Sequence, residues 1–221
     1  MVLIEPYIES LIKLLKQNFV SRLLYVGLQG SYLRGEANEN SDIDIMVVLD
    51  GFSVEDLILY RNTINEVGNN AKSCGFICGK SELANWNPLE ICQLVHTTKD
   101  YYGQLSKLIP LYTAEDNRNF IKLSLNNLFH EICHRYIHAS REKNAEKLPS
   151  TYKNIFFILQ NLYFQKTGNF IQTKKELLSQ LSEEDSRIFS KALELGTQSD
   201  YGFDEAFQVI FEWCKNTIQN I

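Results

Sequence analysis

The sequence predicts an α+β fold in two parts, a small mixed sheet with flanking helices followed by an all-α helical bundle. Three observations favour this class. Short β-type runs alternate with helical segments up to about residue 112, the pattern beyond is almost wholly helical, and residues 110–115 form the best boundary between the two. We therefore expect one domain over residues 1–112 and the helical bundle over residues 113–221.

The first half is expected to hold four strands and two longer helices. Residues 5–19 repeat apolar side chains at helical spacing, and Ser53 with Asp56 has the spacing of a capping box. The apolar runs at residues 23–28 and 43–49 are typical of buried strands. The expected helices are 5–19 and 53–67, and the expected strands are 23–28, 43–49, 74–78 and 91–95.

The second half is expected to be helical throughout. The expected helices lie near 116–142, 151–167, 173–182, 184–196 and 203–219. Proline and glycine residues fall between these segments, where they interrupt a helix most readily. These are Pro149, Gly168, Gly196 and Gly202.

Composition limits the classes of function. Of the 221 residues, 44% are hydrophobic, which is enough for a substantial core, and the net charge of −5 argues against a protein that mainly grips nucleic acid. No apolar run approaches the roughly 20 residues of a membrane span, and the first residues lack a signal-peptide pattern. The five cysteines are odd in number and scattered. We expect a cytoplasmic protein with no membrane partner.

The stretch from Gly30 to Ile45 carries the chemistry. Asp42 and Asp44 are two residues apart on a β run, so both carboxylates leave the same face. Carboxylates that close repel one another unless a cation lies between them, and Mg²⁺ is the natural candidate because it takes oxygen ligands and bridges to substrate phosphates. Gly30 lets a backbone pass close to a ligand, and Ser31 adds a hydroxyl at the start of a turn. This order of features suits nucleoside triphosphate chemistry.

The same segment resembles the signature of the nucleotidyltransferase superfamily, which includes polymerase β and bacterial aminoglycoside nucleotidyltransferases. That signature is a hydrophobic strand, Gly-Ser, a spacer, and Asp-hydrophobic-Asp on the next strand. The resemblance implies that Gly30 and Ser31 contact the phosphates of ATP, with Arg34 and Ser41 also on the nucleotide side. It also implies that the Asp42–Asp44 pair holds Mg²⁺, with two ions expected.

The second half resembles the family more weakly. In kanamycin-type members a glutamate general base is followed four residues later by a lysine, and here Glu131 and Arg135 have that spacing. Streptomycin-type members carry a lysine after a later helix and a glycine turn, where it contacts the triphosphate. Lys174 stands in the matching place. The resemblance thus implies a cleft between the two domains as the site, Glu131 as a catalytic residue and Lys174 as a nucleotide contact.

The chain departs from the family on the strand expected at 74–78. Many members carry a third acidic residue there, whereas this chain has Cys74 or Gly75. The general base is therefore open between Glu131 and Glu90, and a catalytically inactive nucleotide-binding protein stays an alternative.

A competing pattern lies in the second half. His130, Glu131 and His134 match the H-E-x-x-H pattern of zinc peptidases, and His138 extends the row by one turn. Three fixed positions recur readily by chance, and the expected context of a zinc peptidase is missing. This alternative is therefore remote.

The resulting prediction is a Mg²⁺-dependent nucleotidyltransferase that moves a nucleoside monophosphate, AMP from ATP in the first instance, to a hydroxyl group. The acceptor is expected to be a small molecule such as an aminoglycoside-like antibiotic, as in resistance enzymes. A regulatory enzyme that AMPylates a protein, of the toxin–antitoxin kind, is the alternative. Nucleic acid is not an expected partner, and related enzymes suggest a homodimer while the sequence leaves the oligomeric state open.

Overall fold

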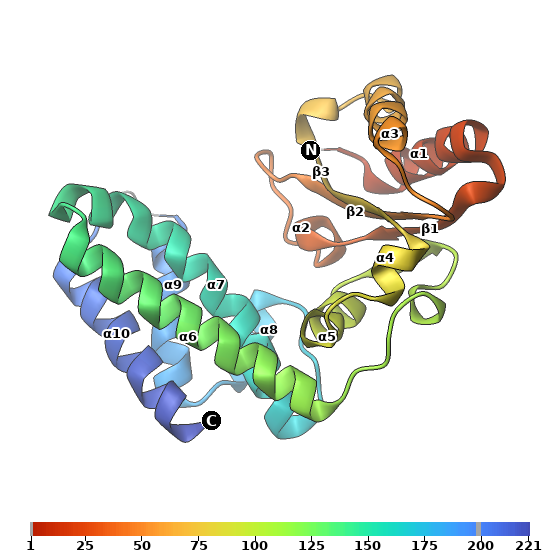
Figure 1. The fold of residues 1–221 in the computed structure, drawn as a ribbon. Helices are drawn as coiled ribbons and strands as arrows, with labels where there is room; N and C mark the ends of the chain where they lie inside the picture. The colour runs from red at the N-terminus through yellow and green to blue at the C-terminus, as the bar shows by residue number, and fades with distance from the viewer. Residues whose placement is uncertain (1, 198–199) are drawn as a thin grey trace. The chain divides into compact units, whose positions relative to one another are not determined.

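The computed structural model describes residues 2–197 and 200–221, and the chain divides into two compact units, Met1–Tyr112 and Thr113–Ile221 (Figure 1). Within the described ranges, no helix combines the length and the apolar character needed to cross a membrane.

The first unit is built on a mixed sheet of four strands. Its central strands, β1 (Leu23–Leu28) and β2 (Ile43–Leu49), run antiparallel. Strand β3 (Ser73–Gly79) lies parallel to β2 at one edge, and β4 (Lys99–Tyr102) lies antiparallel to β1 at the other. The parallel β2–β3 pair is joined by a helical crossover, as parallel strands require.

Helices cover both faces of this sheet. On one face α1 (Ile4–Phe19) and α3 (Val54–Val67) lie side by side (Figure 1), and the buried apolar residues of α1 share a core with Ile43, Ile45 and Val47 of β2. Met46 and Val48 of β2 pack in a separate core on the opposite face. Asp44 belongs to that second face because it lies two residues before Met46.

Short elements complete the first unit. These are the α-helices α2 (Gly30–Leu33), α4 (Lys80–Ala84) and α5 (Pro88–His96), and the 3₁₀ turns Val20–Arg22, Asn70–Lys72 and Leu105–Lys107.

The strand expected at 91–95 is wrong, because these residues belong to α5. The backbone N–H of Leu89 donates to the Asn87 side chain at 3.1 Å, and Pro88 occupies the first helical position. An Asn cap followed by Pro is a strong helix start. The fourth strand is instead β4, which begins at Lys99.

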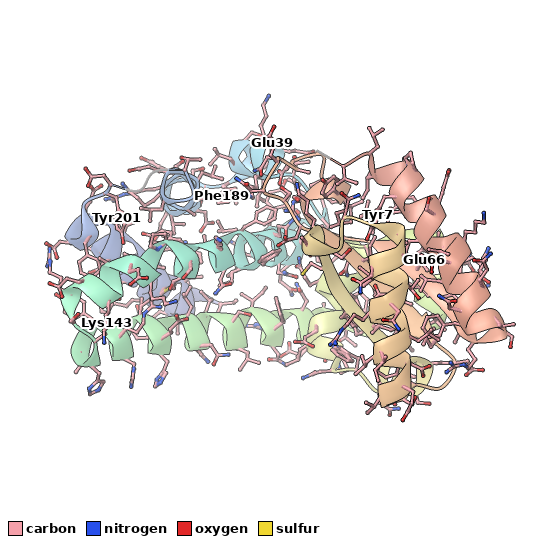
Figure 2. All side chains as sticks on the ribbon, turned by 90° about the horizontal axis from the view of Figure 1, so that it is seen from above. Tyr7, Glu39, Glu66, Lys143, Phe189 and Tyr201 are labelled. Atoms are coloured by element: carbon pink, nitrogen blue, oxygen red, sulfur yellow. The ribbon has the colours of Figure 1, made fainter. Side chains whose placement is uncertain are left out.

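The second unit consists of five helices within its described residues. They are α6 (Ala114–His138), α7 (Arg141–Thr167), α8 (Lys174–Gln180), α9 (Glu183–Leu195) and α10 (Phe203–Asn220). Their buried faces form one apolar core. Phe189, labelled in Figure 2, stacks on Phe156 with ring centroids 5.7 Å apart, which joins α9 to α7.

Pro149 does not separate two helices, as the sequence led us to expect, but lies inside α7. The helix begins earlier because the Ser140 hydroxyl accepts the N–H of Lys143, which caps its first turn. A proline cannot donate to the carbonyl four residues before it, here that of Ala145. The hydroxyl of Tyr201 (labelled in Figure 2) donates to that carbonyl instead. This replacement partner is why the helix passes through Pro149 without an orphaned acceptor.

Candidate active site

The Gly30–Ser31 turn and the Asp44 carboxylate are in direct contact. Gly30 has a φ of +70°, and a Cβ added there would lie 1.8 Å from Oδ2 of Asp44. Both the backbone conformation and the space therefore require glycine at this position. The Gln29 N–H donates to the Asp44 carbonyl oxygen at 2.8 Å, which fastens the turn to β2. The residues that the sequence singled out as a phosphate turn and a metal pair are thus neighbours.

Asp42 and Asp44 differ in their surroundings. Asp42 is exposed just before β2 begins, whereas Asp44 is the second residue of the strand and is half-buried. Burial is the largest influence on the pKa of Asp44 and raises it above the ordinary value. The Cys74 thiol, as a hydrogen-bond donor, lowers this pKa, the negative charge of Asp42 raises it, and the positive charge of Arg34 lowers it. The net rise means that burial and the charge of Asp42 together outweigh the Cys74 hydrogen bond and the charge of Arg34.

Cys74 occupies the position opposite Asp44. The two residues are partners in the parallel β2–β3 register, so their side chains leave the same face of the sheet. The next residue, Gly75, has a φ of +103°, and a Cβ there would lie 2.1 Å from the carbonyl oxygen of Ile45. Position 75 therefore cannot carry a side chain. Within β3, which is described throughout, no carboxylate stands beside the Asp42–Asp44 pair.

Arg34 and Ser41, both expected on the nucleotide side, have structural partners. Nε of Arg34 lies 2.8 Å from a carboxylate oxygen of Glu36, and both side chains are largely buried. The Ser41 hydroxyl accepts the Asn38 N–H at 2.8 Å, which closes the turn before Asp42. Arg34 therefore acts on the site at least through its charge near Asp44, and Ser41 shapes the loop that delivers Asp42.

Glu131 and Lys174 belong to the second unit. An oxygen of Glu131 lies 2.6 Å from a guanidinium nitrogen of Arg135, whose other terminal nitrogen donates to the Thr151 hydroxyl at 2.6 Å. Lys174 is the first residue of α8, and its ammonium lies 5.9 Å from the centre of the Phe156 ring. The other candidate base, Glu90, accepts from the Trp86 indole N–H at 2.6 Å. Both candidate bases thus already hold a hydrogen-bond donor.

The donors present at the Asp42–Asp44 pair fit Mg²⁺. Both are carboxylates, whose oxygen atoms are the ligand type that Mg²⁺ prefers, and they lie two residues apart. Among the described residues, no group of three or more His, Cys, Asp or Glu side chains is arranged to hold a metal ion. An ion at the pair would therefore take its other ligands from water and from substrate phosphates, as Mg²⁺ commonly does.

Among the comparisons with known proteins, the match to a family model falls in the first unit. Residues 8–86 match the family model described as a nucleotidyltransferase domain, a range that includes the Gly-Ser turn and both aspartates. No curated protein sequence matches the chain.

Solved structures extend the likeness to both units. A spectinomycin adenyltransferase, AAD(9), from Enterococcus faecialis, solved with ATP and spectinomycin, has a TM-score of 0.62 and 15% identity, and covers 97% of this chain and 98% of its own. A toxin–antitoxin structure with AMP-PNP has a TM-score of 0.33 and 23% identity, over 58% of this chain and 91% of its own. A nucleotidyltransferase-like protein from Exiguobacterium sibiricum has a TM-score of 0.39 and 10% identity, over 96% of this chain and 74% of its own.

The last two scores are too low to support an argument about this chain, and at 15% identity the first shows a common fold alone. It matches the α+β class expected from the sequence, a mixed sheet with helices followed by a helical bundle. Residues 8–86 thus match a nucleotidyltransferase domain, and the chain as a whole shares the fold of a spectinomycin adenyltransferase.

Proposed function

We propose that the protein is a Mg²⁺-dependent nucleotidyltransferase that moves AMP from ATP to a hydroxyl group of a small molecule. The observation that carries this proposal is the seating of the Asp44 carboxylate against Gly30 of the Gly-Ser turn, with Asp42 two residues away. A turn that binds phosphate, in contact with a carboxylate that binds Mg²⁺, would bring the triphosphate and its counter-ion together.

The reaction breaks one bond and forms one. The acceptor oxygen attacks the α-phosphorus of ATP, the bond from that phosphorus to the bridging oxygen breaks, and pyrophosphate leaves with the electron pair. The hydroxyl proton passes to a general base. Mg²⁺ at Asp42 and Asp44 would neutralise the charge that develops on the phosphate oxygens. The protein's own part is to hold the α-phosphate in line with the acceptor, while Arg34 adds positive charge near Asp44.

Five residues are proposed on the nucleotide side. The Ser31 hydroxyl and the Gly30 backbone contact phosphate oxygens, and Lys174 steadies the outer phosphates as a point charge. Arg34 and Ser41 support the same region indirectly. Arg34 adds positive charge near Asp44, and Ser41 closes the turn before Asp42.

The general base is proposed to be Glu131, with Glu90 as the alternative. Glu131 is held by Arg135 and lies within 3.4 Å of the Thr151 hydroxyl, so its carboxylate is oriented before any acceptor arrives. The isosteric variants Glu131→Gln and Glu90→Gln separate the two. The true base, once changed, lowers kcat by about 10²–10⁴-fold and leaves Mg²⁺-dependent ATP binding unchanged. If neither change lowers kcat, this assignment is wrong.

The acceptor is proposed to be a polyhydroxylated antibiotic of the aminoglycoside or spectinomycin kind. The support is the shared fold with a spectinomycin adenyltransferase that was solved with ATP and spectinomycin. The net charge of −5 is compatible with a cationic acceptor.

Pyrophosphate release tests the proposed function. The wild-type chain is incubated with Mg²⁺ and each nucleoside triphosphate against a panel of aminoglycosides, spectinomycin and lincosamides. We expect release with one class of acceptor, reduced at least about a hundredfold in Asp42→Asn, since loss of a metal ligand removes several kcal/mol of charge stabilisation. Asp50→Asn, an exposed carboxylate just after β2, is the matched control and is expected to keep full activity. Release that is unaffected by Asp42→Asn would show that the pair is not the site.

A further inference from the structure

Three exposed histidines form a row on one face of α6. His130, His134 and His138 are four residues apart, which is close to one helical turn. Their imidazole rings are neighbours, since the centroids of His130 and His134 are 5.8 Å apart and those of His134 and His138 are 4.7 Å apart. The nucleotidyltransferase chemistry proposed above uses none of them. The row extends to the last residue of the helix.

The spacing of the last two rings suits chelation. A ring nitrogen binds a transition metal at about 2 Å, which places the ion on the order of 3 Å from the ring centroid by the same geometry. One ion can therefore bind a nitrogen of each ring when the centroids are 4.7 Å apart, as they are for His134 and His138. The pair needs only rotation of two exposed side chains to reach this arrangement, because neither ring is packed in the core.

The surroundings of the pair favour a cation. His138 ends a helix of 25 residues, where the last carbonyl groups concentrate partial negative charge. The nearest cationic side chain along the helix, Arg135, is turned to Glu131 and Thr151 and has its charge balanced there.

We propose that His134 and His138 form a two-imidazole site for a borderline divalent transition metal ion such as Ni²⁺, Cu²⁺ or Zn²⁺, separate from the Asp42–Asp44 pair. Neutral imidazole selects these ions over Mg²⁺. Within the described parts of the chain no third His, Cys, Asp or Glu joins such a group, so the other coordination positions are left to water or to an exogenous ligand. The ion at this site is therefore exchangeable.

Calorimetric titration of the full chain with Ni²⁺, in excess Mg²⁺ to occupy the carboxylates, tests the site. We expect one ion per chain, and affinity at least about tenfold lower in His134→Asn and in His138→Asn, a loss of about 1.4 kcal/mol or more. His130→Asn is the control within the row, and His96→Asn, the one histidine of the first unit, is the control outside it. Cys74→Ser removes the exposed thiol. All three are expected to bind as the wild type does.

A second measurement is independent of affinity. Paramagnetic Ni²⁺ at substoichiometric concentration is expected to broaden NMR signals at the C-terminal end of α6 and to leave β2 unaffected. Wild-type binding by His134→Asn or by His138→Asn would overturn the proposal, and so would broadening centred on Asp42 and Asp44. None of these results bears on pyrophosphate release, so the metal site and the proposed function can fail separately.

Discussion

The pKa of Asp44 is set by opposing influences. Burial and the negative charge of Asp42 both raise its pKa, while the Cys74 thiol and the charge of Arg34 lower it, and burial is the strongest of the four influences. The ionised carboxylate is therefore a cost to the folded chain unless a cation is present. Sites of function commonly carry such costs, because the group that binds the ligand is not the group that best stabilises the fold.

This cost predicts a stability change with a defined sign. The folded chain holds the Asp44 proton more tightly than the unfolded chain, so this group's contribution to stability falls as pH rises from its ordinary pKa to its raised pKa, and it stays unfavourable above that. In EDTA at neutral pH, Asp44→Asn is expected to raise the Tm while abolishing activity. Added Mg²⁺ with ATP is expected to raise the Tm of the wild type and not that of the variant. Thermal scans check both, and a lower Tm for Asp44→Asn in EDTA would contradict the assignment of the cost.

Gly30 offers a second test at the residue scale, with Gly35 as its matched control. Both have a φ near +70°, but an added Cβ meets the Asp44 carboxylate at 1.8 Å in one case and nothing within 4 Å in the other. Alanine at either position costs roughly 1 kcal/mol of backbone strain. Only Gly30→Ala is also expected to displace the carboxylate, so it should raise the Mg²⁺ concentration needed for half-maximal activity by about tenfold or more. Equal metal dependence in the two variants would show that the contact is incidental.

The sequence predicts the identity of the central site residues but not all of their roles. The two-residue spacing of Asp42 and Asp44 and the glycine before Ser31 were enough to propose a metal pair and a turn, and the structure adds that they touch. The ion pair of Arg34 with Glu36 and the turn closed by Ser41 were not foreseen. Local hydrogen bonds of this kind compete with ligand contacts, and no periodicity reveals them.

At the scale of elements, the short apolar runs 23–28, 43–49 and 74–78 are strands as the sequence predicts, whereas the run 91–95 is helical. Residues 91–95 are apolar enough for a strand, yet Asn87 and Pro88 start a helix there. The cap, four residues upstream, was the better signal. A short apolar run alone cannot distinguish a strand from a buried helix face.

Pro149 shows the opposite case, because this proline lies inside α7 although proline usually interrupts a helix. A proline inside a helix leaves one carbonyl without its donor, and the penalty depends on whether another group replaces it. The Tyr201 hydroxyl does so from a residue 56 positions away. A long-range partner of this kind is invisible in a local reading of the sequence.

A double-mutant cycle tests this replacement. Tyr201→Phe is expected to lower the free energy of unfolding by about 1 kcal/mol, since it orphans the Ala145 carbonyl. In a Pro149→Ala background, where an N–H can again reach that carbonyl, the same change is expected to cost clearly less. Urea unfolding gives both values, and Ser150→Ala serves as the exposed neighbouring control. Equal costs in the two backgrounds would mean that the tyrosine does not substitute for the missing N–H.

For the whole molecule, the succession of strands and then helices predicted the α+β class, and the shared fold confirms it. The strand order β3-β2-β1-β4 was not predicted. Order is set by which apolar faces can be buried together, and here β2 has apolar side chains on both faces that pack against different cores. That property places β2 inside the sheet, so the site at its N-terminal end lies between two neighbouring strands.

The most direct test of the central claim follows the phosphorus atoms. Wild-type chain and Asp44→Asn are incubated with Mg²⁺, the acceptor panel, and ATP labelled at either the α- or the γ-phosphorus. Nucleotidyl transfer predicts that the wild type moves the α-label into the acceptor and releases the γ-label in pyrophosphate. Asp44→Asn is expected to do neither. Entry of the γ-label into the acceptor, or α-label transfer that survives Asp44→Asn, would contradict the account.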